Sequence, residues 1–265
     1  MICSTCGVQR ANAPVPLVCP ICEDERQYVP KSGQAWTTLG EVAAERRIVV
    51  EERRAGLFEL RAEPEFGIGQ RMFFVVTEKG NFTWDLVPFV DETILEFFER
   101  HGGVDGMAIS HPHFYSTMRD WHEETNAPIY THAEDAAWLG ERFEGQELWT
   151  EPRRQLSDQV QLIHCGGHFE GSAIMHVAPE VGEPFILTGD TIYPVVDGKH
   201  VSFMRSFPNN VPLGPKRLRG IDDALKGIKF DQIYGAFPGH EILKDGRASY
   251  EKSMARYLNY IHDAA

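Results

Sequence analysis

Apolar and polar positions alternate with the period of strands in some stretches of the chain and with the period of helices in others. Strands are predicted at 47–51, 57–62, 71–77, 81–87, 106–110, 128–131, 160–164, 173–178, 184–188 and 231–234. Helices are predicted after residue 38 and at 92–100, 117–124, 133–142, 221–226 and 250–262. The early strands follow one another directly, whereas strands and helices alternate later. This order predicts an α/β (α+β) fold in layers, with sheets inside and helices outside.

Capping and turn residues mark several of these boundaries. Thr38 and Glu41 form a capping-box pattern, which predicts a short helix that begins after Thr38. Asp91 can cap the helix at 92–100, and Gly102-Gly103 can end it. The run Glu78-Lys79-Gly80-Asn81 separates two strand patterns and predicts a hairpin.

The net charge and the lengths of the apolar runs limit which partners and which location we expect for the protein. The chain has 265 residues, and 39 acidic against 26 basic side chains give a net charge of -13. Such an acid excess repels phosphate backbones, so we expect no nucleic-acid partner. No apolar run approaches the roughly 20 residues of a membrane span, and the first residues lack the features of a signal peptide. We therefore expect a cytoplasmic protein with a small-molecule substrate and no membrane partner, and the sequence sets no oligomeric state.

Four of the five cysteines form a compact pattern. Cys3, Cys6, Cys19 and Cys22 make two C-x2-C pairs, in a segment too short to bury a core without a metal or disulfides. Two such pairs close a tetrahedral site, which predicts a structural zinc ion. We expect a zinc module over 1–28, a linker at Lys31-Ser32-Gly33 and a main domain over 32–265.

Two alternatives to zinc stay open at the cysteines. Cys6-Gly7 and Cys19-Pro20 resemble the knuckles of a rubredoxin-like iron site. Disulfides are the other alternative, although they conflict with the missing secretion signal. The fifth cysteine, Cys165, is interpreted as a small buried residue at a strand end.

Histidines and an aspartate follow predicted strands at four places. The segments are Ser110-His111-Pro112-His113, Gly166-Gly167-His168, Leu187-Thr188-Gly189-Asp190 and Pro238-Gly239-His240. Residues two apart on an extended segment project to one side, so His111 and His113 are expected to point the same way. Imidazole and carboxylate ligands from separate loops are typical of a catalytic zinc or iron site.

The order and spacing of these segments resemble the metallo-β-lactamase superfamily. Its members carry H-x-H-x-D-H, a Gly-His before Gly-Ser, a Gly-Asp after a strand and a late Gly-His. The run Gly167-His168-Phe169-Glu170-Gly171-Ser172 matches the second piece closely, and Asp85 matches the end of the family's early strand. The resemblance covers about residues 32–265. It implies a four-layer αββα sandwich, here preceded by the zinc module, with a metal site at one edge between two sheets.

The resemblance also implies a ligand set. The first metal position would be held by His111, His113 and His168, and Asp190 would bridge to a second position that includes His240. The family's next Asp and His fall on Tyr115 and Ser116, neutral groups that are poor metal ligands. We therefore expect one strongly held Zn or Fe ion and a degraded second position. His122 and His132 are candidates for a compensating ligand.

The implied activity is that of a metal-dependent hydrolase that uses a metal-bound hydroxide held by histidines and an aspartate. Asp190 would orient the nucleophile, and Tyr115 is a candidate donor to an oxyanion. Arg205 is a candidate contact for an anionic substrate. The alternatives are a mononuclear iron dioxygenase or a rubredoxin-linked oxidoreductase of the same superfamily, or a non-catalytic binding protein.

Overall fold

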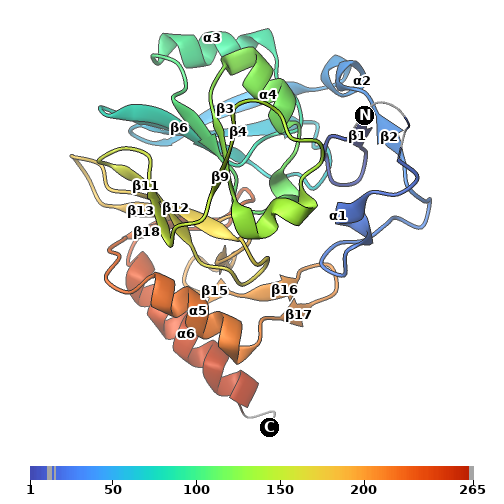
Figure 1. Ribbon diagram of the computed structural model, residues 1–265. Coiled ribbons are helices and arrows are strands. Elements are labelled where there is room, and N and C mark those ends of the chain that lie inside the picture. The colour runs from blue at the N-terminus through green and yellow to red at the C-terminus, as the bar shows by residue number, and fades with distance from the viewer. Residues whose placement is uncertain (11–13, 15, 263–265) are drawn as a thin grey trace.

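Two β-sheets face each other at the centre of the molecule, and helices cover their outer faces (Figure 1). The structure is a computed structural model that describes residues 1–10, 14 and 16–262. Helices α3 (Glu92–Arg100) and α4 (Met118–Thr125) lie over one sheet, and α5 (Pro215–Ala224) and α6 (Gly246–His262) lie over the other. This is the αββα sandwich that the sequence predicts.

The first sheet has the order β3-β4-β5-β6-β7-β8-β9. Its strands are β3 (Arg47–Arg54), β4 (Leu57–Glu63), β5 (Met72–Thr77), β6 (Gly80–Trp84), β7 (Gly106–Ala108), β8 (Ile129–His132) and β9 (Gln146–Trp149). Strands β3 to β6 pair antiparallel, and β6 to β9 pair parallel. The parallel half brings the ends of β6, β7 and β8 to one edge of the sheet.

The second sheet has the order β10-β11-β12-β13-β18-β19. Its strands are β10 (Arg153–Gln155), β11 (Val160–His164), β12 (Ala173–Val177), β13 (Phe185–Leu187), β18 (Gln232–Tyr234) and β19 (Glu241–Ile242). Only β13 and β18 pair parallel among these neighbours.

Short elements complete the described chain. They are β1 (Ile2–Cys3) paired with β2 (Trp36–Thr37), β14 (Tyr193–Pro194) with β15 (Val201–Ser202), β16 (Met204–Ser206) with β17 (Val211–Pro212), the helices α1 (Pro20–Glu23) and α2 (Leu39–Ala44), and the 3-10 helices η1 (Pro112–Phe114) and η2 (Ala133–Trp138). No helix in the described part of the chain combines the length and apolar character needed to cross a membrane.

Three apolar clusters fill the spaces between the layers. The space between the two sheets contains, among others, Phe73, Trp84, Leu162 and Met175. The outer face of the first sheet packs against Ile94 and Phe98 of α3 and Trp121 of α4. The outer face of the second sheet packs against Leu218 of α5 and Tyr250 of α6. Burial of these apolar surfaces is the main force that holds the layers together.

The capping residues behave as the sequence predicts. Thr38 accepts a hydrogen bond from the Glu41 backbone, and the Glu41 carboxylate accepts one from the Thr38 backbone, so α2 begins with a capping box. The Asp91 carboxylate accepts a hydrogen bond of 2.9 Å from the Ile94 amide, and α3 has the predicted bounds. Each cap satisfies an amide that the first helical turn leaves without a partner.

Three helix predictions are wrong in extent. The helix expected at 133–142 is the shorter 3-10 helix η2, which ends at Trp138 because Leu139 is extended. Helix α5 begins at Pro215, six residues before the predicted start, because proline suits the first helical position whereas Lys216-Arg217 hide the apolar period. Helix α6 begins at Gly246 rather than Tyr250.

The cysteine segment packs against the main fold rather than beside it. Ile2, Ile21 and the four paired cysteines belong to the same apolar cluster as Phe74 of the first sheet and Phe98 of α3. Strand β1 pairs with β2, which lies beyond the expected boundary at residue 28. The domain boundaries at 28 and 32 stay a prediction, but the segment shares its core with the rest of the chain.

Candidate functional site

Four of the predicted ligands lie together where strands of the two sheets end. His111 and His113 follow β7, His168 lies in the loop between β11 and β12, and Asp190 follows β13. All four side chains are buried. One ligand atom from each lies within 4.8 Å of the others. We call these four residues the histidine cluster.

The three imidazole rings of the histidine cluster are almost equally spaced. Their ring centres are 5.0 to 5.1 Å apart in all three pairs. His168 Nε2 lies 3.2 Å from His113 Nδ1, and Asp190 Oδ2 lies 3.5 Å from His111 Nε2. Ligand atoms at about 2.0–2.2 Å from one tetrahedral ion are roughly 3.3–3.6 Å apart. These two distances are close to the spacing that one divalent ion requires, and the His168 Nε2 to Asp190 Oδ2 distance of 4.0 Å is somewhat longer.

Hydrogen bonds to neighbouring groups fix two of the rings. His111 Nδ1 lies 2.8 Å from Ser110 Oγ, and that hydroxyl donates a 2.7 Å bond to Asp85 Oδ1. His168 Nδ1 donates to the Met204 carbonyl at 3.0 Å. These bonds leave Nε2 of both rings facing the centre of the cluster. Partners of this kind orient the imidazole ligands of metal sites, so Asp85 is placed as the early-strand resemblance implies.

One glycine makes this close arrangement possible. Gly189, just before Asp190, has a φ of +52°, and a Cβ on it would lie 2.5 Å from Ser110 Oγ. A larger residue would displace the hydroxyl that holds His111.

Several buried atoms of the histidine cluster have no hydrogen-bond partner. They are His111 Nε2, His113 Nε2 and Asp190 Oδ1. A buried polar atom without a partner costs about 1–3 kcal/mol. Of these atoms, His111 Nε2 lies among the clustered ligand atoms, whereas His113 turns its Nδ1 toward His168. The four buried ligand atoms that lie within 4.8 Å of one another fit a metal ion.

The protonation of the rings also suits a metal. Burial lowers the pKa of His111 and of His168 to about 3, so both rings are neutral near pH 7. Neutral imidazole is the form that binds metals. Burial raises the pKa of Asp190 to about 6, and a cation beside this carboxylate would favour its charged form.

The second metal position has fewer free donors. His240 lies close enough to Asp190 to influence its pKa, but it is not part of the histidine cluster. Its Nδ1 donates to the Pro194 carbonyl at 2.8 Å, and its Nε2 lies 3.2 Å from the Tyr193 hydroxyl. Both ring nitrogens are therefore already hydrogen-bonded.

Among the described residues, the side chains of Tyr115 and Ser116 form no hydrogen bond with the histidine cluster. The Tyr115 hydroxyl donates to the Asp135 carbonyl at 3.3 Å, and burial raises its pKa well above the usual value. Ser116 has a left-handed backbone with φ of 48°, and its carbonyl accepts a bond from the Gln9 amide. The contact to Asp135 favours a packing role for Tyr115.

The other candidates lie elsewhere. Arg205 forms an ion pair of 2.6 Å with Glu25, so its charge is already matched. His122 Nδ1 hydrogen-bonds to the Ala127 carbonyl, and its ring lies against Phe143. Neither residue reaches the histidine cluster, so His122 is not a compensating ligand in this arrangement.

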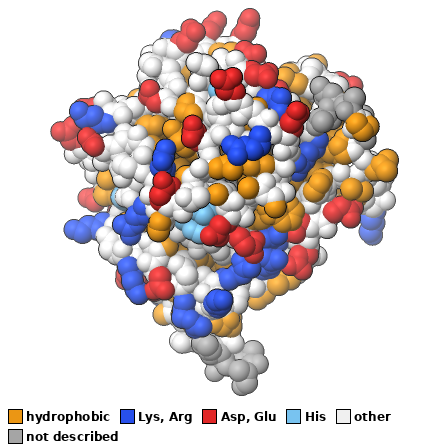
Figure 2. All heavy atoms as spheres, viewed as in Figure 1, with side chains coloured by type: hydrophobic (Ala, Val, Ile, Leu, Met, Phe, Trp, Pro, Cys, Tyr) orange, Lys and Arg blue, Asp and Glu red, His pale blue; other side chains and the backbone are white. Residues whose placement is uncertain are grey.

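His132 belongs to a different group that the sequence analysis missed. Together with Glu134 and His164 it forms a third set of close ligand atoms. The rings of His132 and His164 stack 3.7 Å apart at 15°. Parallel stacked rings direct their nitrogen lone pairs into separate planes, so the two rings cannot coordinate one ion together. On the face of the molecule seen in Figure 2, exposed histidine atoms lie next to acidic and basic side chains.

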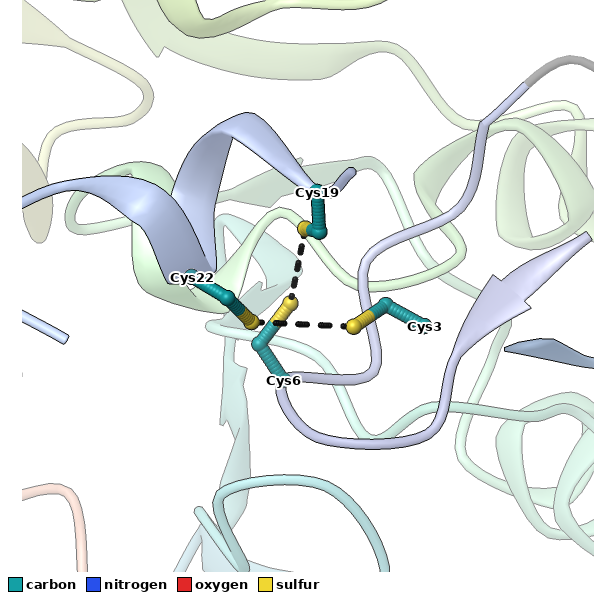
Figure 3. A group of neighbouring side chains, drawn as sticks. All are labelled: Cys3, Cys6, Cys19 and Cys22. Atoms are coloured by element: carbon teal, nitrogen blue, oxygen red, sulfur yellow. Dashed lines mark hydrogen bonds between the residues drawn. The ribbon is translucent and has the colours of Figure 1, made fainter. Parts of the chain in front are cut away.

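The four cysteines of the two C-x2-C motifs converge on one point (Figure 3). Cys3 Sγ lies 3.6 Å from Cys22 Sγ, and Cys6 Sγ lies 3.6 Å from Cys19 Sγ. All five cysteines of the chain are free, and these separations far exceed a disulfide bond of about 2.05 Å. The structure thus disfavours the disulfide alternative, and four converging sulfurs fit a tetrahedral zinc or iron ion.

Hydrogen bonds inside this cysteine cluster stabilise a thiolate. The bond from Cys19, together with those from the other thiols, holds the pKa of Cys3 well below its usual range. Gln34 Nε2 also donates to Cys3 Sγ at 3.2 Å. The same contacts lower the pKa of Cys19 to about 7 but raise the pKa of Cys6 and of Cys22. A metal requires deprotonated thiols, so a bound ion would have to displace the protons of Cys6 and Cys22.

A pocket of about 220 Å³ opens beside the histidine cluster and includes His113 and Asp190 in its wall. The other lining residues come from the cysteine segment, the loop between β4 and β5, and the late loops: Thr5, Arg26, Gln27, Tyr28, Gly67, Ile68, Phe207, Pro208 and Phe237. Sequence reasoning found none of these, because they meet only after folding. Arg26, for example, reaches the carbonyl of His168, 142 positions away.

Comparison with solved structures identifies the fold. The chain superposes on DIM-1 metallo-β-lactamase with a TM-score of 0.60 and 13% identity, over 83% of this chain and 99% of that one. It superposes on a B3 metallo-β-lactamase with an active-site glutamic acid with a TM-score of 0.54 and 14% identity, over 81% and 91% of the two chains. The protein therefore has the metallo-β-lactamase fold.

Comparison of sequences gives the family. The chain is 34% identical over 265 residues to YmaE of Bacillus subtilis (strain 168), an uncharacterized protein, covering 98% of this chain and 96% of that one. The chain belongs to the YmaE family. No protein-family model matches it.

Proposed function

We propose that this protein is a metal-dependent hydrolase of a small-molecule substrate. The observation that supports the proposal is the convergence of four buried histidine and aspartate ligand atoms beside an open pocket. A site with donors on one side and a pocket on the other matches the open coordination of catalytic metal centres. A purely structural ion would be enclosed on all sides.

The residues have separate tasks in this proposal. His111, His113 and His168 hold the ion as neutral imidazoles, and Asp190 adds a carboxylate. A bound zinc or iron ion supplies a Lewis acid and lowers the pKa of its water to about 7. The Ser110 hydroxyl and the Met204 carbonyl keep two of the rings in place.

Asp190 is the candidate for proton transfer. Its Oδ1 is buried without a partner, so it can accept a hydrogen bond from water that enters the pocket. Burial raises its pKa to about 6, and a cation beside it would lower that pKa, so the carboxylate would be charged at neutral pH and able to accept this bond. Asp190 would thus orient the attacking water and hold its proton.

We also propose one strongly held ion at this site. The second position keeps Asp190 and His240, but both nitrogens of His240 are engaged by Pro194 and Tyr193. The cysteine cluster would hold a second, separate ion with a structural role.

Metal analysis combined with an activity panel tests the proposal. Mass spectrometry of protein purified without added metal should give about two ions per chain, one for each cluster. A panel of esters, thioesters, phosphodiesters and a β-lactam should contain a substrate, and the β-lactam is included because the similar solved structures are β-lactamases. Turnover that survives complete loss of the histidine-cluster ion would contradict the proposal.

An oxidoreductase is the second candidate, and one observation favours it. The cysteine cluster packs against the wall of the pocket rather than at a distance from it. Iron at the four sulfurs would place a redox centre near the histidine cluster. The colour of the purified protein separates the two candidates, because an iron–tetrathiolate site is red and zinc is colourless.

A further inference from the structure

The cysteine segment supplies one wall of the metal pocket. Thr5 lies between the two cysteines of the first pair, and Arg26, Gln27 and Tyr28 follow the second pair. All four residues line the same pocket as His113 and Asp190. A purely structural role does not require the module to line the metal pocket.

Several contacts hold this wall in position. Arg26 donates to the His168 carbonyl at 3.3 Å, and its guanidinium stacks 3.7 Å from the centre of the Phe169 ring. Glu25 pairs with Arg205, and its carbonyl accepts a 2.9 Å bond from Asn209.

The opposite side of the segment is held by a close backbone approach. Gly67, which also lines the pocket, has a φ of +65°, and a Cβ on it would lie 3.1 Å from backbone atoms of Cys6 and Gly7. The first pair of cysteines thus packs directly on the loop that forms the floor of the pocket. An ion at the cysteines would fix the wall as a rigid unit.

Gln27 is the residue of this wall with unused hydrogen-bonding capacity. Its side chain is 8% exposed, and its Oε1 is buried with no partner. A buried amide oxygen without a partner is costly. Rotation of the Gln27 side chain toward the pocket would let a ligand supply the missing donor. The neighbouring Arg26 has no such capacity, because Asp24 and Glu170 already match its charge.

Apart from Thr5 and the two residues of the histidine cluster, the rest of the wall is mostly apolar. Ile68, Phe207 and Phe237 line the pocket together with the ring of Tyr28. Pockets for drug-sized ligands have about 300–1,000 Å³, so a cavity of about 220 Å³ suits a smaller molecule. Among the described lining residues, the only cation is the matched Arg26.

We propose that the cysteine module is the substrate-recognition wall of the metal pocket. Gln27 accepts a hydrogen bond from a small, uncharged substrate, and the apolar part of that substrate packs between Tyr28 and the phenylalanines. This inference rests on the proposed metal site, and it assigns the cysteine module a binding role in addition to its structural one.

Binding of simple metal chelators tests the inference without any turnover. Acetohydroxamate offers a metal-binding group alone, benzohydroxamate adds a ring, 4-aminobenzohydroxamate adds a donor, and 4-carboxybenzohydroxamate adds a negative charge. Calorimetry on metal-loaded protein should show benzohydroxamate binding about tenfold tighter than acetohydroxamate, because the ring is buried. The amino compound should bind tighter still, and the carboxylate should lose the advantage.

Variants of the wall locate the effect. Tyr28→Ala should reduce the preference for the ring, and Gln27→Ala should remove the gain from the amino group, about three- to tenfold for one hydrogen bond. Glu23→Gln is the matched control, because Glu23 is exposed on α1 and does not line the pocket. It should keep every preference. Benzohydroxamate should also slow hydrogen exchange of the amides of residues 4–8 and 25–28, which acetohydroxamate should not do.

The outcomes separate the two proposals. Equal binding of all four compounds, or preferences that survive both wall variants, would overturn the role of the module while leaving the metal site intact. A histidine cluster without metal, by mass spectrometry of the same samples, would overturn the proposed function and this inference together.

Discussion

The cysteine cluster and the histidine cluster differ in how they are closed. The four sulfurs face one another in an apolar core, and Cys3 Sγ also accepts a hydrogen bond from Gln34. The histidine cluster has donors on one side and a pocket on the other. A tetrahedral site with four protein ligands has no open position, whereas an open position is what chemistry on a substrate needs. The two sites therefore differ in whether the ion would be enclosed by protein or open to a pocket, and not in the number of ligands.

They also differ in how they are assembled. The cysteines come from two turns of one short segment, so local structure alone can bring them together. The histidine cluster takes residues from the ends of β7, β11 and β13, which lie in two different sheets. It exists only when the sandwich has formed. Loss of one cluster should therefore affect stability, and loss of the other should affect chemistry.

The largest expected effect separates the two clusters by function. Replacing His113 with alanine removes one of three imidazole ligands. The variant should lose about one ion per chain and all hydrolysis, because catalysis requires the open metal site. Metal content and turnover of the best substrate measure the outcome.

The control for this variant is His200→Ala, which removes a histidine that pairs with Asp197 outside the cluster. It should retain both ions and full activity. If the His113→Ala protein were active without this ion, the histidine cluster would not be the site of hydrolysis.

The next effect concerns stability. The double replacement Cys3→Ser with Cys19→Ser should also remove about one ion, but here the whole chain should be destabilised because the sulfurs share a core with the first sheet. A loss of about 3 kcal/mol would lower Tm by roughly 6–12 °C in a chain of this size. Calorimetry should show one cooperative transition.

Cys165→Ser provides the matched control, since it removes a buried thiol outside the cluster and should leave both ions in place. A separate early transition for the cysteine segment, with the main transition unchanged, would instead support an independent module over 1–28.

A smaller effect is expected from the support of one ligand. Ser110→Ala breaks the chain of hydrogen bonds from Asp85 to His111. Loss of such a partner lowers metal affinity about 10–100-fold. Competition with a fluorescent chelator would measure this, with Ser157→Ala as a control outside both clusters. Unchanged affinity would show that the ring needs no orientation by its neighbour.

Tyr115→Phe should have little effect on chemistry. Its hydroxyl donates to the Asp135 carbonyl, so the variant should lose about 1 kcal/mol of stability and keep nearly the same kcat. If instead kcat fell about 100-fold, the hydroxyl would act as an oxyanion donor, and the open cluster would include one more catalytic residue.

The smallest effect concerns the third group of ligand atoms. Burial lowers the pKa of His132 to about 4, so its ring should stay neutral until the solution is well below pH 6. Its contribution to stability is therefore complete above about pH 6.5, the ordinary value, and is lost as the pH falls through about 4. NMR titration of the ring protons measures this pKa. A value near 6.5, or a third ion in metal titrations, would show that this group is more than a stacked pair.

Much of the layered fold could be predicted because its signals are local. Asp91 and Thr38 cap their helices through neighbours three residues away, and both helices begin where the sequence predicts. The sequence does not predict strands of two or three residues, such as β14, β16 and β17, because so short a stretch shows no alternation. The start of α5 was missed because its first turn is polar.

The site was predictable only where residue types alone carry the chemistry. The cysteine cluster follows from spacing and ligand type, and the ligand set of the histidine cluster follows from the resemblance to the metallo-β-lactamase superfamily. The roles of Arg205 and Gln27 could not be predicted, because they depend on which loop faces which. Arg205 contacts Glu25, which is 180 positions away in the sequence. The local sequence around either residue does not indicate that contact.

The docking of the cysteine segment on the pocket has a consequence for how the protein is made. Cys22 precedes Asp190 by roughly 170 positions, which take about 10–30 s to synthesise at 5–20 residues per second. The sulfur ligands are thus complete, and can capture their ion, while the strands that carry the histidines are still being translated. The cysteine side of the wall is translated before the reactive centre, whereas Phe207, Pro208 and Phe237 of the same pocket follow Asp190 in the chain. The pocket is therefore complete only after both sets of ligands have been translated.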